Sequence, residues 1–396
     1  MSDLTRRDLI KAGAALAGGW AAGPWAALAS GAPGILEPPL KGKLVGTVPF
    51  LGEPAIPFGE TTGAGLSGRR AFDLGTLTAE RLVPPSDRHF IHTLFPARLD
   101  PRRYWQITFR GHGFPAAEVP LKDLLPLAEP MGVHLAECVD NGREHGWGLI
   151  SAAEWKGIPF RKIFERIGRP PEDGWVLVSG NDLHLSTRPD LGAGASWLFS
   201  PAELEAAGAF LATEMNGQPL AEDLGYPVRL VVPGWYACAW IKWVETIVYL
   251  PKWAEVTAHM REFTAQTFQN GVPRRAERYY PPRIEPAALP VRVERWRSRE
   301  GFTFRIVGVA WGGARPPRSL EIRFDPEGEF EPVSHFVAPA NTATWTLWSH
   351  LWRPAEAGAY TLDLQVDGSR MRSRRLSLGV YTRQVQIDRP NPASSP

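Results

Sequence analysis

The chain has 396 residues, with 44 lysines and arginines against 42 aspartates and glutamates, which gives a formal net charge of +2. A chain this close to neutral has no overall excess of positive charge for nucleic acid or anionic lipid, so neither is expected as a partner. Hydrophobic residues make up 44% and there are 16 tryptophans, enough for a large core and roughly two domains of about 150 residues each.

Residues 1–29 predict a cleaved export signal. A charged start with Arg6 and Arg7 precedes a Gly/Ala-rich apolar run, and Ala27-Leu28-Ala29 resembles a cleavage site. Adjacent arginines before a weakly apolar run are typical of the twin-arginine type, which carries proteins already folded around a cofactor. The run is shorter than the roughly 20 apolar residues that a membrane span needs. A periplasmic location is therefore expected.

The next two segments predict an arm and an α+β domain. Residues 30–85 are rich in Gly and Pro, which favours an extended N-terminal arm over regular structure. In residues 86–276, the segments 104–111, 175–180 and 228–234 read as short strands that end in glycine. Segments 121–127, 159–167 and 200–215 read as helices, the last with Ser200 as its N-cap. Strands and helices do not alternate regularly, so an α+β fold fits better than a doubly wound sheet.

The last third of the chain predicts an all-β domain. Residues 277–290 contain four prolines and are the best candidate for a linker. In residues 291–385, short alternating segments separated by turn residues are typical of a β-sandwich. The tail, residues 386–396, is expected to be disordered.

The two cysteines, Cys138 and Cys238, leave several chemistries open. In an oxidising compartment they could form a disulfide. Cys138 could also be a buried small hydrophobe, a metal ligand, or the nucleophile of a hydrolase with His134 or His145 as base. The sequence has no C-x-x-C pattern for zinc, an iron–sulfur cluster or attached haem, so no second redox centre is visible in it.

Five segments, in order, resemble the sulfite oxidase family of molybdenum cofactor enzymes. They are Glu137-Cys138-x-x-Asn141-Gly142-Arg143, residues 149–157, residues 214–220, residues 225–234 and Lys242-Trp243. Residues 308–313, with Trp345, Trp348 and Trp352, resemble the immunoglobulin-like dimerisation domain that follows in that family. The similarity covers roughly residues 85 to 380. It implies a sulfite-oxidase-type molybdopterin-binding domain followed by an all-β immunoglobulin-like sandwich.

The resemblance implies a set of site residues around a molybdenum-molybdopterin (Mo-pyranopterin) cofactor. Cys138 would ligate the metal through its thiolate, a soft donor suited to a redox metal. Arg143 would favour the thiolate and line an anion pocket. The implied catalytic residues are Cys138, Arg143 and His92, and the implied cofactor contacts are Phe90, Ile91, His92, Thr93, Leu94, Cys138, Asp182, Arg229, Trp240, Ile241 and Lys242, of which Arg229 and Lys242 would bind the phosphate. Surface cations at Arg143, Arg229 and Lys242, and a turn-forming Asp182, are the alternatives.

The chain also departs from the family pattern. His92 and Leu94 replace the arginine and histidine of a Phe-x-Arg-Asn-His segment, and Leu224 replaces another histidine. Phe263 or Phe268 stands where a pocket tyrosine is expected, and Asp140 replaces a small residue. His92 could be a proton shuttle or a core histidine. Because sulfite needs concentrated positive charge, we expect oxygen-atom transfer on a less charged S- or N-oxide.

Several partners are expected on the same grounds. Electrons would pass to or from an external periplasmic partner, either a c-type cytochrome or a membrane quinone-linked subunit. The resemblance of the sandwich implies a homodimer. The alternative function is a non-catalytic molybdopterin-binding or interaction protein whose pocket has degenerated.

Overall fold

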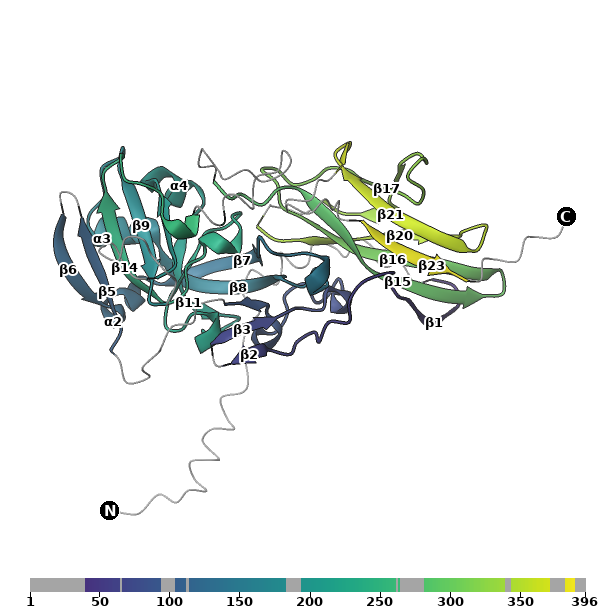
Figure 1. Cartoon of the computed structure of the whole chain (residues 1–396), viewed down its shortest axis with the longest axis horizontal. Coiled ribbons are helices and arrows are strands. Elements are labelled where there is room, and N and C mark those ends of the chain that lie inside the picture. Colours follow the sequence, from purple (N-terminus) through teal and green to yellow (C-terminus); the bar gives the residue numbers. More distant parts are fainter. Residues whose placement is uncertain are drawn as a thin grey trace, which may run out of the picture. The chain divides into compact units, whose positions relative to one another are not determined.

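The computed structural model describes residues 40–64, 66–93, 104–111, 114–182, 194–260, 263, 281–338, 343–370 and 382–388 (Figure 1). The chain divides into two units, residues 1–35 and 36–396, and the second contains all the described structure. The predicted export signal and Leu94 lie outside the described residues. Within the described ranges, no helix is both long enough and apolar enough to cross a membrane.

The segment predicted as an irregular arm contains regular structure. β1 (Lys43–Val48) pairs antiparallel with β15 (Ala287–Ser298), and β2 (Thr62–Ala64), β3 (Ser67–Arg70) and β4 (Ile91–His92) form a three-stranded sheet. Two 3-10 turns, η1 (Leu74–Thr76) and η2 (Ser86–Arg88), lie between β3 and β4. The strands form because a segment that passes the edge of a sheet satisfies its own N–H and C=O groups and those of the edge. The sheet β2-β3-β4 places Arg69 opposite His92.

Two five-stranded sheets build the next part of the fold. The first has the order β10-β9-β14-β5-β6, made by β5 (Gln106–Gly111), β6 (Phe114–Pro120), β9 (Trp175–Gly180), β10 (Ser196–Phe199) and β14 (Val244–Leu250). The second has the order β12-β11-β8-β7, with β13 paired to β11. Its strands are β7 (Glu129–Glu137), β8 (Ile150–Pro159), β11 (Phe210–Met215), β12 (Gln218–Pro219) and β13 (Arg229–Val231). All pairings are antiparallel except that of β14 with β5.

The helices in this region are short. They are α2 (Leu121–Leu124) with η3 (Leu125–Leu127), α3 (Phe160–Ile167) and α4 (Pro201–Ala206). Ser200 caps α4 as predicted, with its side chain accepting from the Glu203 N–H. The prediction of one helix over residues 200–215 is wrong in its second half, because Gly208 adopts a left-handed φ of 62° that ends the helix. Residues 210–215 instead form β11, a buried strand flanked by β8 and β13.

The C-terminal region has the predicted two-sheet sandwich, whose strands run alongside one another in Figure 1. One sheet has the order β1-β15-β16-β20-β19, with β16 (Gly301–Trp311), β20 (Thr346–Trp352) and β19 (His335–Phe336). The other contains β17 (Leu320–Arg323), β18 (Glu331–Pro332), β21 (Gly358–Val366), β22 (Ser369–Arg370) and β23 (Arg383–Ile387). β15 begins at Ala287, inside the predicted linker, and β23 ends at Ile387. The rings of Phe324 and Trp352 stack with centroids 4.5 Å apart and join the two sheets.

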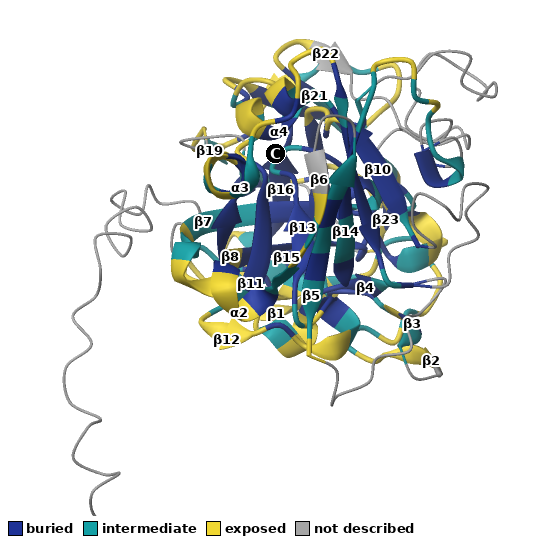
Figure 2. Cartoon of the chain, turned by 90° about the vertical axis from the view of Figure 1, so that its left-hand side faces the viewer, coloured by how far each residue is buried: buried dark blue, intermediate teal, exposed yellow. Residues whose placement is uncertain are grey.

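The buried side chains form one continuous cluster that includes both regions. In Figure 2 the strands β8 and β11 are dark blue along most of their length. Six tryptophans are among the largest fully buried side chains: Trp155, Trp197, Trp243, Trp311, Trp345 and Trp348. Indole rings bury a large apolar area and still need a partner for their N–H, so they fix one element against another.

Candidate functional site

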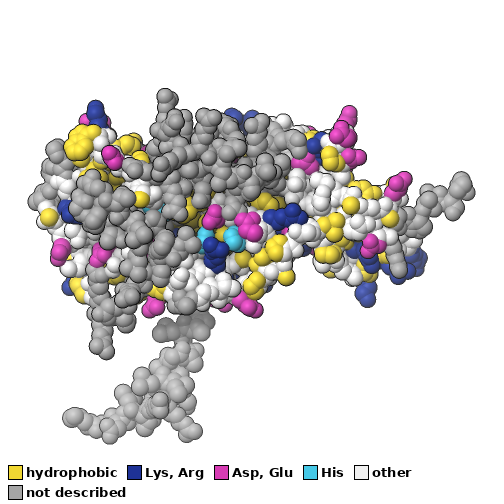
Figure 3. Space-filling model, viewed as in Figure 1, with side chains coloured by type: hydrophobic (Ala, Val, Ile, Leu, Met, Phe, Trp, Pro, Cys, Tyr) yellow, Lys and Arg dark blue, Asp and Glu magenta, His cyan; other side chains and the backbone are white. Residues whose placement is uncertain are grey.

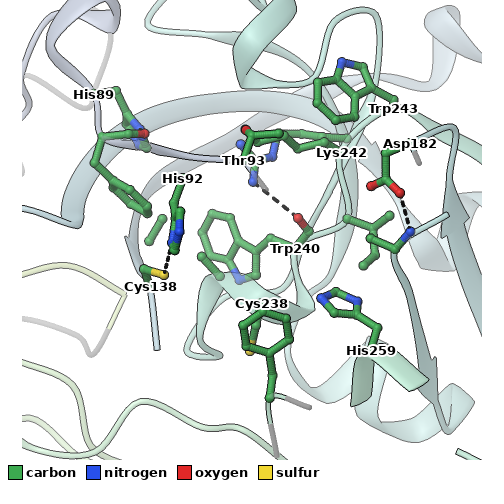
Figure 4. Close-up of a pocket in the computed structure, with 17 residues that line it drawn as sticks. His89, His92, Thr93, Cys138, Asp182, Cys238, Trp240, Lys242, Trp243 and His259 are labelled. Carbon is green, nitrogen blue, oxygen red and sulfur yellow. Dashed lines mark hydrogen bonds between the residues drawn. The ribbon is translucent and has the colours of Figure 1, made fainter. Parts of the chain in front are cut away.

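A cavity is lined by residues in or next to the sheets β10-β9-β14-β5-β6 and β12-β11-β8-β7 and from the segment around β4 (Figure 4). It has about 860 Å³ of empty space, including its open mouth. Residues from well-separated parts of the chain line it. From the predicted site these are Phe90, His92, Thr93, Cys138, Asp182, Arg229, Trp240, Ile241 and Lys242.

Cys138 follows directly after β7 and is held in place by backbone hydrogen bonds. Its N–H donates to the Leu149 carbonyl at 2.9 Å, and its own carbonyl accepts from the Asn141 N–H at 2.9 Å. The Asn141 side chain closes the loop, because its Oδ1 accepts from the Leu149 N–H at 3.1 Å. The thiol is buried and lines the cavity. The loop therefore presents one sulfur atom in a fixed position.

Two nitrogens approach this sulfur. His92 Nδ1 lies 3.2 Å from Sγ, the contact drawn as a dashed line in Figure 4, and the Asp140 N–H points to Sγ with a distance of 3.4 Å. Burial, followed by the positive charge of Arg69, lowers the pKa of His92 to about 4. The ring is therefore neutral at neutral pH, unlike the guanidinium that the family pattern has at this position.

The opposite end of the cavity is cationic. Arg229 in β13 is buried, and its Nη1 and Nη2 donate to the carbonyls of Leu224 (3.0 Å) and Trp240 (3.4 Å). Its guanidinium also lies over the rings of Trp155 (5.7 Å) and Trp240 (5.8 Å). Its Nε has no hydrogen-bond partner, and no carboxylate pairs with it among the residues described. Burial lowers the pKa of Arg229 to about 10.

Lys242 is the second cation at this end. Its Nζ donates to Thr93 Oγ1 at 2.7 Å and to the Asp223 carbonyl at 2.5 Å. Burial, and next the charge of Arg229, lower the pKa of Lys242 to about 7. Two buried cations that destabilise one another are stabilised together by an anion between them. This end of the cavity therefore fits a phosphate.

Asp182 lies just after β9 and shapes the wall. Its Oδ1 accepts from the Ala195 N–H at 2.6 Å, as Figure 4 shows. At Gly194, next to Ala195, a Cβ would lie only 1.8 Å from the Gly180 carbonyl oxygen. Only glycine allows the backbone at position 194 to approach the Gly180 carbonyl this closely. Gly194 therefore helps to fix the positions of Asp182 and Ala195 in the cavity wall.

Two predicted site residues lie elsewhere, and a third is not described by the structure. Ile91 is buried but does not line the cavity, and Leu94 is outside the described residues. Arg143, in the 3-10 turn η4 (Arg143–His145), is exposed; its Nη2 donates to the Leu51 carbonyl at 3.0 Å and the side chain does not line the cavity. Gly146, at a left-handed φ of 57°, closes this turn and directs the arginine toward the N-terminal segment.

Other residues lining the cavity were not predicted as site residues. They are His89, Ala136, Ala195, Ala237, Cys238, Trp243, His259 and Phe263. From the sequence, Cys238 was expected only as a disulfide partner, and Phe263 only as the place of a missing tyrosine. Both cysteines are thiols rather than halves of a disulfide, and burial raises the pKa of Cys238 well above its usual range. Only two of these residues could have been found from the sequence motifs. His89 directly precedes Phe90, and Trp243 directly follows Lys242, in the family-like segments.

The surroundings of His92 carry both signs of charge. Asp140 Oδ2 lies 4.0 Å from His92 Nδ1, and the His145 ring centroid lies 6.4 Å from that of His92. Burial, followed by Arg69, also lowers the pKa of His145. Figure 3 shows histidine beside acidic and basic side chains on the surface in view. The approach to Cys138 thus lacks the purely positive field that would suit a dianion.

The cavity fits a metal held by a phosphorylated organic cofactor. At one end is a sulfur donor fixed by its loop, and at the other are two buried cations and the unpaired Nε of Arg229. A soft thiolate suits a redox metal, and the cation pair suits a phosphate. The wall between them is formed by aromatic and polar groups, including Trp240 and Asp182.

Comparisons with known proteins agree with this fit. Residues 92–256 match the model of the oxidoreductase molybdopterin binding domain family. Sulfite oxidase from Gallus gallus is 28% identical over 344 residues, 78% of this chain and 71% of that protein. Mitochondrial sulfite oxidase from Homo sapiens is 27% identical over 313 residues, 73% of this chain but 56% of that protein, so the chain spans little more than half of the mammalian relative. The crystal structure of the sulfane dehydrogenase SoxCD from Paracoccus pantotrophus superposes with a TM-score of 0.65 at 18% identity, covering 83% of this chain and 88% of that one, which shows a shared fold. Residues 92–256 are thus identified as an oxidoreductase molybdopterin binding domain, in a chain that is similar to sulfite oxidases over most of its length.

Proposed function

We propose that this chain is a periplasmic oxidoreductase that binds a molybdenum-pyranopterin and catalyses two-electron oxygen-atom transfer on a small S- or N-containing substrate. One observation carries the proposal: a single cavity contains the fixed thiol of Cys138 and the buried cation pair Arg229 and Lys242. The pair is costly for the folded protein by itself, because two neighbouring buried cations repel one another and no carboxylate pairs with Arg229 among the described residues.

The residues present divide the binding work between them. Cys138 would ligate the metal, and Arg229 and Lys242, with Thr93 orienting the lysine, would hold the phosphate. The Asp140 N–H and His92 Nδ1 would stabilise negative charge on the sulfur. When bound, the cofactor supplies the two-electron redox chemistry, while the protein orients it and sets its electrostatic surroundings.

The substrate is proposed to be less charged than sulfite. His92 is neutral at neutral pH, Asp140 adds a carboxylate beside it, and Arg143 does not line the cavity. Losing one charge-assisted hydrogen bond commonly costs about 1.5–3 kcal/mol, roughly 10- to 150-fold in affinity. A sulfoxide or N-oxide binds without that requirement, since its oxygen needs only a neutral donor.

Location and partners belong to the same proposal. The adjacent arginines of the N-terminal segment support export in the folded state. The sequence carries no haem or cluster motif, so electrons would be exchanged with an external c-type cytochrome or quinone-linked subunit. The two-sheet sandwich supports a homodimer, which light scattering at micromolar concentration would test.

The test is the metal and pterin content of protein exported natively, compared between Cys138→Ser and Cys238→Ser. Both cysteines line the cavity and neither is bridged to the other, so the second variant is a matched control. We expect wild type and Cys238→Ser to contain about one molybdenum per chain, and Cys138→Ser to lose it. Equal molybdenum in both variants, or none in wild type, would refute the proposal.

Activity is then measured over sulfite, sulfoxides, N-oxides and nitrate with artificial electron donors and acceptors. Turnover of an uncharged S- or N-oxide with higher kcat/KM than sulfite supports the proposed substrate class. Sulfite as the best substrate contradicts it. Fully loaded protein that turns over none of them would favour the non-catalytic molybdopterin-binding alternative.

A further inference from the structure

His89 is a buried histidine in the cavity wall that has no part in the roles assigned above. It lies between η2 and β4, is 1% exposed, and lines the cavity (Figure 4). Its ring stacks on Phe90 (centroids 5.2 Å apart, planes at 20°) and meets the edge of Trp155 at 6.2 Å. The backbone is fixed as well, because Arg70 Nε donates to the His89 carbonyl at 2.9 Å. The ring therefore has one orientation.

The contacts of His89 determine where its proton lies. Nδ1 is 3.0 Å from the Phe90 carbonyl oxygen, which can only accept, so Nδ1 carries the hydrogen. Burial, as the first cause, lowers the pKa of His89 to about 3, so the ring is neutral and Nε2 keeps its lone pair. Nε2 is buried and has no hydrogen-bond partner within the described part of the chain. A buried acceptor without a partner is unfavourable, and one that belongs to a cavity wall can be completed by a bound group.

His89 belongs to the cationic end of the cavity. Arg229 lies over the same Trp155 ring whose edge His89 meets. Arg229, Arg70 and Lys242 all act on the His89 ring through their charges. Beside three cations a second proton on the imidazole is disfavoured, so Nε2 acts as an acceptor rather than a donor. A ligand group that suits it is an N–H, next to the place where Arg229 and Lys242 fit a phosphate.

The family pattern has cofactor-binding histidines where this chain has Leu94 and Leu224. Leu224 is buried in the core, and only its carbonyl serves the site, as the acceptor for Arg229 Nη1. A substitution of histidine by leucine removes a polar group from the cofactor site, and a polar group elsewhere in the same cavity can replace it. His89 is such a group, because it is buried and lines the cavity just before β4.

We propose that His89 is a cofactor-binding residue of this chain, whose Nε2 accepts a hydrogen bond from an N–H group of the pyranopterin and takes over the role of a histidine that is absent at Leu94 or Leu224. The inference rests on the proposed function, since it needs the pyranopterin in this cavity. It assigns no role in the redox step, and its readout is cofactor retention rather than turnover.

The test compares His89→Phe with His134→Phe. Phenylalanine keeps an aromatic ring beside Phe90 and Trp155 but removes the acceptor. His134 is a matched control because it also meets a carbonyl through one nitrogen (Nε2 to Met131, 2.8 Å), leaves the other, Nδ1, without a partner, and packs on an aromatic ring, Phe210, yet does not line the cavity. Pterin is released by denaturation, oxidised and quantified by fluorescence, before and after prolonged dialysis of the natively loaded protein.

Removing one hydrogen bond to a neutral acceptor predicts about two- to ten-fold faster loss of pterin from His89→Phe. His134→Phe should lose pterin at the wild-type rate. Equal retention in His89→Phe and wild type overturns the inference while leaving the proposed function standing. Wild type that never contains pterin overturns both.

A second measurement does not depend on a stable variant. In wild-type protein labelled with ¹⁵N-histidine, the Nε2 resonance of His89, assigned by its absence in His89→Asn, should shift when loaded protein replaces the unloaded form. A resonance that stays the same in both forms overturns the inference even if His89→Phe cannot be purified.

Discussion

The indole Nε1 of Trp311, in the sandwich strand β16, donates a 2.8 Å hydrogen bond to Oε2 of Glu137, the residue directly before Cys138. Both side chains are buried, and the other carboxylate oxygen of Glu137 accepts from Asn141 Nδ2 at 3.4 Å. Asn141 in turn holds the Leu149 N–H that closes the cysteine loop. The sandwich therefore helps to position the loop that presents the sulfur, in addition to any role in assembly.

Trp311→Phe should both destabilise the fold and loosen the cysteine loop. Phenylalanine fills most of the space but leaves the buried carboxylate with one donor fewer, which commonly costs about 1–3 kcal/mol. We expect a lower free energy of unfolding in urea and a lower molybdenum content per folded chain.

Trp348→Phe is the control for this variant. Trp348 lies in the neighbouring strand β20 and its Nε1 donates to the Val309 carbonyl at 3.1 Å, within the sandwich. It should lose stability and keep its molybdenum. If both variants lost molybdenum in proportion to stability, the link from Trp311 to the cysteine loop would be of no consequence for the metal.

Because Lys242 is buried, we expect the free energy of unfolding of the unloaded protein to depend on pH. The pKa of Lys242 is about 7 in the folded state and near its usual value of 10.5 when unfolded, mainly because of burial. Between these values the unfolded state binds more protons, so the free energy of unfolding rises with pH, by up to about 1.4 kcal/mol per pH unit for one proton. Below pH 7 Lys242 is protonated in both states, and the full cost of burying its charge lowers the free energy of unfolding.

Urea unfolding of unloaded protein at pH 7, 8 and 9 measures this slope. Lys242→Met should remove most of it and be more stable than wild type at pH 7, because a buried charge is gone. Lys156→Met serves as the control, since Lys156 is an exposed lysine paired with Glu214 on the surface, and should keep the wild-type slope. If Lys242→Met kept the wild-type dependence of the free energy of unfolding on pH, burial of Lys242 would not be its cause.

The residues that the sequence motifs single out line one cavity where a motif lies next to a strand end. Cys138 after β7 and Arg229 in β13 are placed by backbone pairing, which the local sequence determines. Arg143 could not be placed in this way, because its direction depends on η4, on Gly146 and on Leu51, which lies 92 positions earlier. His89 was not singled out because its value as an acceptor depends on the Phe90 carbonyl and on cations distant in sequence.

The fold likewise contains some features that the local sequence determines and others that depend on contacts distant in sequence. The sandwich and the cap at Ser200 follow from local alternation and local hydrogen bonding, and both were predicted. The change from helix to strand after Gly208 was not, because residues 210–215 have a helix-compatible composition. Strands β8 and β13 on either side decide their conformation. Likewise, β1 forms only because β15 offers it an edge.

Gly194→Ala should disturb the cavity wall. A Cβ there would lie 1.8 Å from the Gly180 carbonyl oxygen and 3.1 Å from Asp182 Oδ1, so the backbone has to move. Overpacking of this kind typically costs about 1–3 kcal/mol. We expect a lower Tm and a reduced pterin content. Gly358→Ala, where nothing lies within 4 Å of the added Cβ, should change neither, and equal effects of the two would mean that the wall tolerates the shift.

His92→Arg should restore affinity for sulfite. The side chain at this position lies against Cys138, and an arginine would add a permanent positive charge with forked donors where the chain has a neutral ring. A regained charge-assisted hydrogen bond is worth roughly 1.5–3 kcal/mol, so the KM for sulfite should fall by roughly 10- to 150-fold. Steady-state oxidation of sulfite with an artificial electron acceptor measures the KM.

His145→Arg is the control, because it adds the same charge at a ring whose centroid lies 6.4 Å from that of His92. It should lower the KM for sulfite much less. If both variants lowered the KM equally, general attraction at the mouth would set the affinity. If neither did, the histidine at position 92 would not explain why sulfite is disfavoured, and the carboxylate of Asp140, 4.0 Å away, would become the next residue to replace.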